Sequence, residues 1–151
     1  MVEDLIPEPF IDAVTTASVM VLQLNPGLDP VGDPIAHADL RFRKALFANL
    51  RHEASDWPFH FLDPRFRQST PGGRWWTART KKLAEAVGYE RLAKQLAVVE
   101  WFPYKSTRFK PGCRVDSQQY GLFLVSSAIR RGALIVISRR AAWWEHDPTS
   151  V

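Results

Sequence analysis

Three short apolar runs, each closed by residues that cannot continue a strand, constrain the fold of this chain more than any other feature. Residues 18–24 stop at Asn25-Pro26-Gly27, and residues 96–102 stop at Pro103. Proline and glycine interrupt β-structure, so both runs predict short strands. Residues 133–137 are apolar without alternation, which predicts a strand that is covered on both faces.

Helical patterns separate these runs. Residues 38–54 place leucine and alanine near helical spacing, with Arg and Lys between them, which predicts an amphipathic helix. Residues 75–95 return to a helical pattern, interrupted near Gly88, which would serve as a C-cap between two helices. Between the two patterns, residues 55–74 contain three prolines and two glycines, and we expect an irregular loop there, of the kind that is usually functional or mobile.

One more helix is predicted before the last apolar run. Asp116 or Ser117 can cap its start, the pattern continues through Arg131, and Gly132 closes it. The order strand, helices, strand, helix, strand is typical of right-handed parallel crossovers. We therefore expect a single α/β domain over residues 1–151, three-layered, with a short parallel sheet and helices on both faces.

The run at residues 18–24 is expected to be the central strand, between residues 96–102 and 133–137. In open sheets of this kind, ligands bind beyond the carboxyl ends of the strands. Three polar or basic loops follow the three runs and should converge on one edge: Asn25-Pro26-Gly27, Pro103-Tyr104-Lys105-Ser106 and Ser138-Arg139-Arg140.

Composition excludes several classes of protein. A chain of 151 residues, 46% of them apolar, can fill one core. The one cysteine, Cys113, cannot form an internal disulfide, and the four His have no metal-ligand spacing, so we expect a reducing compartment and no metal or cofactor. The acidic N-terminus and the lack of an apolar run of about 18 residues indicate a cytoplasmic protein without a membrane partner.

Charge is distributed unevenly along the chain. Residues 1–40 hold seven acids and no Lys or Arg, which leaves 20 basic and 9 acidic residues in the remainder. Such asymmetry favours an anionic partner, such as nucleic acid or a phosphorylated ligand. The alternative is a basic face that is only solvated.

The first loop and the residues after it resemble a known family. The sequence reads Asn25-Pro26-Gly27-Leu28, then Gly32, Ala36-His37 and Arg41-Phe42. These elements, in this order and at similar spacing, resemble the uracil-DNA glycosylase superfamily, in particular its mismatch-specific uracil/thymine branch. The resemblance covers about a seventh of the chain and implies a uracil-DNA-glycosylase-like fold with a role in DNA repair.

The resemblance implies a role for each part of the loop. Asn25 would hold the water that attacks C1′ of the sugar, while Pro26, Gly27 and Leu28 would face an extruded base, which backbone N–H groups can read. An amide is a poor general base, so positioning is its plausible contribution. The alternative is an ordinary turn that leaves a strand. His37 matches the family's Ala-His pair and is either a ligand contact or a hydrogen-bond partner that fixes the loop.

The sequence also departs from the family. The superfamily has a further strand followed by a His- or Asn-Pro-Ser loop, whereas residues 139–151 are too short for another helix and strand. His146-Asp147-Pro148-Thr149-Ser150 has only a faint likeness to that loop. Either the function has been redirected or this chain lacks the C-terminal element.

The second strand carries Glu100 where many members have a polar residue that contacts the base. A buried carboxylate must be neutral or paired. Glu100 would therefore accept hydrogen bonds from a base or ribose, or pair with a core arginine; the pair is slightly favoured. Tyr104 and Ser106 on the following loop are expected to line the same ligand site.

Basic and aromatic residues interleave in several segments, a mixture that suits single-stranded or distorted nucleic acid. The tryptophans of these segments are more typical of core packing than of base stacking. The residues that we expect to contact nucleic acid are Arg65, Arg67, Arg74, Lys105, Arg108 and Arg139.

Three functions are compatible with these features. The first is a base- or nucleotide-recognising domain that hydrolyses an N-glycosidic bond. The second is a non-catalytic nucleic-acid or nucleotide-binding module on the same fold, and the third is an interaction domain whose Trp-rich surface docks another protein. The sequence indicates neither the base nor the oligomeric state.

Overall fold

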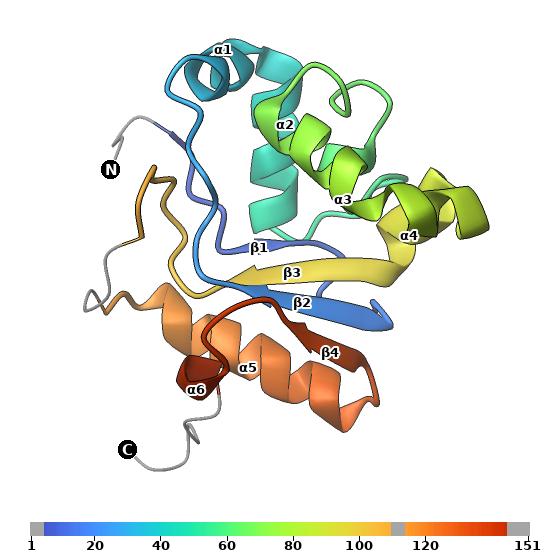
Figure 1. The fold of residues 1–151 in the computed structure, drawn as a ribbon, viewed down its shortest axis with the longest axis vertical. Helices are drawn as coiled ribbons and strands as arrows, with labels where there is room; N and C mark the ends of the chain where they lie inside the picture. Colours follow the sequence, from blue (N-terminus) through green and yellow to red (C-terminus); the bar gives the residue numbers. More distant parts are fainter. Residues whose placement is uncertain (1–4, 110–113, 145–151) are drawn as a thin grey trace.

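The computed structural model describes residues 5–109 and 114–144, which form an α/β domain with a small open sheet. Helices α1–α4 lie on one side of the sheet, and α5 and α6 lie on the other (Figure 1). The elements in chain order are β1 (Phe10–Ile11), β2 (Val19–Gln23), α1 (Gly32–Ala38), α2 (Leu40–Leu50), the 3-10 helix η1 (His60–Leu62), α3 (Pro71–Val87), α4 (Tyr89–Gln95), β3 (Leu96–Glu100), α5 (Ser117–Arg130), β4 (Leu134–Ile137) and α6 (Ala141–Trp144).

The strand order is β1-β3-β2-β4, so β2 is internal, and it is parallel to both β3 and β4. Val19 faces Leu96 on one side and Leu134 on the other. The predicted central position of this strand is therefore confirmed.

The sheet is mixed rather than wholly parallel, because β1 pairs antiparallel with β3. With only two residues, β1 is too short to produce a period-2 pattern in the sequence. Hydrogen bonds from Glu100 N to Pro9 O and from Glu8 N to Pro103 O continue the contact on the N-terminal side of β1. This pairing carries the acidic N-terminal segment to the carboxyl end of β3.

Alternation along β3 divides the core into two layers. Leu96 and Val98 belong to the cluster under α1–α4, whereas Ala97 and Val99 belong to the cluster under α5. Successive side chains of a strand point to opposite faces, so a strand buried on both faces needs apolar residues at every position. β3 is buried along its whole length, and its first four residues are apolar; Glu100, at its carboxyl end, is the exception.

The prediction that residues 133–137 form a strand buried on both faces is wrong. The strand exists, as β4, but it lies at the edge of the sheet, and Leu134 is 62% exposed. Val136 and Ile137 are exposed as well. Continuous apolar sequence also arises in an edge strand whose outer surface is uncovered, and periodicity does not distinguish the two cases.

The helix predicted over residues 38–54 is confirmed as the shorter α2, and a separate helix, α1, precedes it and ends before Asp39. Asp39 has an extended backbone, and its carboxylate accepts a hydrogen bond from Arg41 N, which starts α2. The break at Gly88 is confirmed: its φ of 82° ends α3, and α4 begins directly after it. Asp116 occupies the cap position of α5 without a side-chain capping bond.

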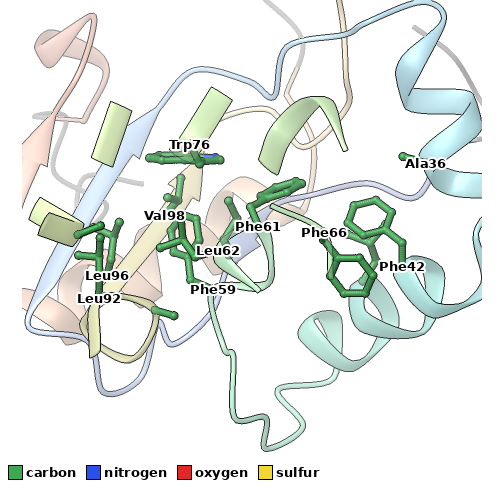
Figure 2. Packing of buried hydrophobic residues seen from close by; sticks show 14 of the residues in the cluster. Ala36, Phe42, Phe59, Phe61, Leu62, Phe66, Trp76, Leu92, Leu96 and Val98 are labelled. Atoms are coloured by element: carbon green, nitrogen blue, oxygen red, sulfur yellow. The ribbon is translucent and has the colours of Figure 1, made fainter. Parts of the chain in front are cut away.

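Residues 55–74 were predicted as an irregular loop, functional or mobile, but they build the core. Phe59, Phe61, Leu62 and Phe66 are buried, and they lie among residues of α2, α3, α4 and β3 (Figure 2). Helix α3 starts at Pro71, inside the predicted loop, where the hydroxyl of Thr70 accepts a hydrogen bond from Gly73 N at 2.9 Å. The proline and the two glycines that predicted a loop, Pro71, Gly72 and Gly73, are thus the first turn of a capped helix.

No helix in the described ranges is both long enough and apolar enough to cross a membrane.

Candidate functional site

The Asn25 side chain has a fixed orientation at the carboxyl end of β2. Its Nδ2 donates hydrogen bonds to Pro26 O and to Ser106 Oγ, each at 2.9 Å, and Ser106 Oγ donates to Arg108 O at 3.1 Å. A carbonyl oxygen only accepts, so the amide nitrogen must face Pro26 O. This assignment leaves Asn25 Oδ1 as the acceptor available to a ligand or a water.

The loops after β2 and β3 meet as expected from the parallel strands. Gly27 and Ser106 form a parallel bridge, and Ser106 N donates to Pro26 O at 3.3 Å. Figure 1 shows the two segments side by side beyond the strand ends. The third loop starts beside them, because Ser138 donates to Leu22 O through its hydroxyl at 2.9 Å and through its N–H at 3.1 Å.

The other residues of the first two loops differ in exposure. Pro26 is buried, Leu28 is half-buried and Gly27 is exposed, with open space where a Cβ would stand. Tyr104 is half-buried, with its ring edge-on to Phe102 at 5.3 Å between centroids. The backbone at Gly27 is therefore the part of this loop that solvent reaches most easily.

Lys105 lies in the interior, which corrects its assignment as a surface contact for nucleic acid. It is 6% exposed, and its Nζ lies 3.1 Å from Glu8 Oε1 and 3.5 Å from Asp33 Oδ1. Burial by itself would lower the pKa of Lys105, but the charges of Glu8 and Asp33 outweigh that effect and raise it above 10.5. Lys105 is a buried cation that joins the N-terminal segment, α1 and the loop after β3.

Glu100 is a buried acid that forms no ion pair with an arginine of the described residues, contrary to the favoured interpretation. It is 7% exposed, and burial raises its pKa well above the ordinary value; the nearby Glu8 raises it further, and Lys105 opposes the rise. Its Oε2 has no hydrogen-bond partner among the described residues. Burial therefore favours the protonated form of this carboxyl group, which can donate a hydrogen bond, over the ionised form.

Two buried histidines lie near this charge cluster. Nδ1 of His37 lies 2.9 Å from Asp33 O, one turn earlier in α1, so that nitrogen carries the proton and Nε2 is an acceptor without a partner in the described residues. Burial, together with the positive charge of Lys105, lowers the pKa of His60 to about 3. His60 is therefore a neutral ring, and neither of its nitrogens has a hydrogen-bond partner in the part of the chain described.

Three of the predicted phosphate-binding arginines lie near the Asn25 loop. Arg74 is close enough to Asp29, four residues after Asn25, for its charge to affect the pKa of that carboxyl. Arg108 is exposed, and its carbonyl accepts from Ser106. Arg139 is exposed directly after Ser138.

The other two predicted arginines contact neighbours within the fold. Arg65 forms an ion pair with the buried Asp63 at 2.6 Å. The Arg67 guanidinium lies 4.1 Å from the centroid of the Tyr89 ring. Of the three arginines near the loop, Arg74 also has such a contact, a hydrogen bond from its guanidinium to Gln68 O at 3.2 Å.

Two hollows in the described part of the chain lie away from Asn25. A cavity of about 40 Å³ is lined by Asp12, Asn49, His60 and Asp63 among others, and an open depression of about 450 Å³ lies along α4. No group of three or more His, Cys, Asp or Glu within residues 5–109 and 114–144 is placed to hold a metal ion. Residues 146–150, with their faint likeness to the family's second motif, lie outside the described residues.

Sequence reasoning missed Glu8, Asp33 and His60. Glu8 stands between two prolines, and His60 stands between two phenylalanines in an apolar stretch. A polar residue enclosed by such neighbours is the one local signal of burial that was available. Comparisons of the chain with protein-family models, with curated proteins and with solved structures found no match.

Proposed function

We propose that the Asn25 loop binds a nucleobase of a nucleic acid and that Asn25 holds the water that hydrolyses its N-glycosidic bond. The observation that carries this proposal is the fixed amide of Asn25: Nδ2 is held by Pro26 O and Ser106 Oγ, so Oδ1 is presented as an acceptor. A group positioned in advance in this way orients a water without reorganisation during the reaction.

In the proposed step, the water oxygen forms a bond to C1′ of the sugar while the bond from C1′ to the base nitrogen breaks. The electron pair of that bond leaves with the base, and a proton from the water passes to the base or to solvent. Glu100 lies at the end of the neighbouring strand and has a raised pKa, and its protonated form would supply a donor for an acceptor atom of the base. Its unpartnered Oε2 supports this role.

The exposed arginines near the loop support a nucleic-acid substrate. Arg74, Arg108 and Arg139 carry positive charge around the edge where the loops meet, and arginine binds phosphate through several N–H donors. Lys105 acts from the interior, where its charge holds the buried acids beneath the loop.

The test is base release from DNA that contains uracil or a mismatch, as single strands and as duplexes, by the native chain and by Asn25→Ala. Loss of one positioned polar contact is expected to lower the rate on the order of a hundredfold, with binding nearly unchanged. Gln95→Ala, which removes an exposed amide at the end of α4, directly before β3, is the matched control and should keep full activity. Thermal unfolding of each variant checks the fold.

Absence of abasic product from the native chain on every substrate would refute the hydrolytic part of the proposal. The second candidate, a non-catalytic nucleic-acid-binding module, would then lead. It is favoured by one observation. The exposed Arg108 and Arg139 flank the Asn25 loop, and the residues of this loop line neither the cavity beside His60 nor the depression along α4. Salt-dependent binding without base release would identify it.

A further inference from the structure

A carboxylate, an imidazole and a phenol lie in a hydrogen-bonded line that includes no residue of the Asn25 loop. Nδ1 of His52 is 3.1 Å from both carboxylate oxygens of Asp12, and Nε2 of His52 is 2.8 Å from the hydroxyl of Tyr120. The three residues come from different elements: Asp12 follows β1, His52 follows α2 and Tyr120 belongs to α5. The line is thus assembled only by the tertiary fold.

The protons in this line can be assigned from the partners. Carboxylate oxygens accept, so Nδ1 of His52 carries the ring proton, and Nε2 is then the acceptor in a neutral ring. In that neutral form the Tyr120 hydroxyl donates to Nε2. This order, in which a nucleophile donates to a base that a carboxylate orients, is the arrangement that activates hydroxyl nucleophiles in enzymes.

The base is held firmly. The His52 ring stacks on Phe10 at 4.6 Å between centroids, with 8° between the planes. The buried amide of Asn49 accepts from Asp12 N at 2.8 Å and donates to Phe10 O at 2.9 Å, so it fixes the backbone of two of the residues that contact the imidazole. Neither the ring nor its carboxylate partner can turn away without breaking these contacts.

The backbone of His52 ends α2. Hydrogen bonds from His52 N to Asn49 O and from Glu53 N to Ala48 O close the last turn of the helix. His52, at the position after the C-cap, has a φ of 52°, the left-handed conformation that is usual there and that glycine adopts at lower cost. These hydrogen bonds fix the backbone from which the imidazole reaches Asp12 and Tyr120.

The surroundings of Tyr120 indicate the class of substrate. Its ring is 42% exposed, and its aromatic neighbours are Phe10 at 6.0 Å, His52 at 6.0 Å and the exposed Phe123, stacked at 6.1 Å. Such a surface is apolar and suits a neutral acyl group better than an anionic phosphoryl group.

We propose that Tyr120 is a nucleophile, activated by His52 and Asp12, for acyl transfer from neutral esters. Tyr120 Oη forms a bond to the carbonyl carbon, the bond from that carbon to the ester oxygen breaks, and the electron pair leaves with the alkoxide or phenoxide. Nε2 of His52 takes the phenol proton and then gives it to the leaving group or to solvent. The product is an acyl-tyrosine and a free alcohol or phenol.

The test uses the full chain and p-nitrophenyl acetate, with acetylation followed at each tyrosine by peptide mass spectrometry. The chain has three tyrosines, so Tyr89 and Tyr104 are internal controls. We expect Tyr120 to be acetylated at least about tenfold faster than either. His52→Gln, which keeps a polar side chain but removes the base, should slow Tyr120 on the order of a hundredfold and leave Tyr104 unchanged.

Two further measurements keep the inference open to refutation. Tyr120→Phe should abolish the adduct in that peptide without lowering the unfolding temperature by more than a few degrees, and acetyl phosphate should react more slowly than the neutral ester. Equal acetylation of Tyr120 in the native chain and in His52→Gln would show that the line only ties α2 to α5. An adduct on His52 in place of Tyr120, or faster reaction with acetyl phosphate, would overturn the assigned nucleophile or substrate class.

Discussion

Replacing Lys105 by Met tests whether the buried charge cluster depends on its one cation. Methionine preserves most of the length and volume of the side chain, so the change removes charge with little loss of packing. Glu8 and Asp33, both 3% exposed, would then remain buried without the cation that lies 3.1 and 3.5 Å from them. An uncompensated buried charge is one of the few single changes that destabilise a protein severely.

The magnitude follows from the geometry. At an effective dielectric constant of about 20, each of the two contacts is worth about 5 kcal/mol of direct attraction, most of which offsets the loss of hydration. Removal of one partner from a buried pair costs about 3–5 kcal/mol. Because a domain of this size is stable by only about 5–15 kcal/mol, Lys105→Met should lose a large part of its stability.

The assay is urea unfolding of the native chain, Lys105→Met and the control Lys94→Met. Lys94 forms an ion pair with Glu90 at 2.8 Å, but both side chains are exposed. We expect almost no change in the free energy of unfolding for Lys94→Met, since water and salt screen exposed pairs. The two variants thus separate burial from ion-pair distance.

The dependence on pH supplies a second check. The pKa of Lys105 is raised, so its contribution in the native chain is fully present below about 10.5 and is lost only as the pH rises through the higher folded value. In Lys105→Met, protonation of the uncompensated acids should reduce the deficit as the pH falls from 8 to 5. A loss of stability no greater than that of Lys94→Met, or a deficit that does not change with pH, would refute the reasoning.

Two further predictions concern single groups near the Asn25 loop. Burial raises the pKa of Glu100 in the folded chain, whereas in the unfolded chain Glu100 ionises above about pH 4.5, so the native chain loses stability as the pH rises from there toward the folded pKa. Glu100→Gln lacks this loss. Its free energy of unfolding should match that of the native chain at pH 4 and exceed it at pH 7.5, by about 1.4 kcal/mol per pH unit up to the folded pKa. Equal stability at both pH values would show that Glu100 is ionised in the fold. Replacing Arg74, Arg108 and Arg139 together by Ala should weaken binding to single-stranded DNA and reduce the slope of log affinity against log salt by about 0.7 per lost phosphate contact. The control replaces Arg91 and Arg130 together by Ala, which removes exposed charge from the helices that precede β3 and β4, at the opposite edge of the sheet. If both sets of substitutions weaken binding equally, the binding is not localised at the loop.

Local sequence determined the main features of the sheet. The apolar run at residues 18–24, stopped by Asn25-Pro26-Gly27, predicted the strand that the fold places at its centre. Gly88 marked the boundary between α3 and α4, because glycine adopts a positive φ at little cost. Since parallel strands end at the same edge, the contact between Asn25 and Ser106, 81 residues apart, also followed from the order of the elements.

Only the tertiary structure decided which polar residues are buried together. Lys105 stands in a basic segment that is indistinguishable from a surface segment in sequence, and its burial depends on Glu8 and Asp33, which come from two distant parts of the chain. The exposure of β4 and the line from Asp12 through His52 to Tyr120 likewise depend on which elements become neighbours. Apolar periodicity indicates which face each segment buries. An ion pair or a hydrogen-bonded line instead requires atoms within about 3 Å of one another. That proximity is set by the packing of separate elements and not by any segment alone.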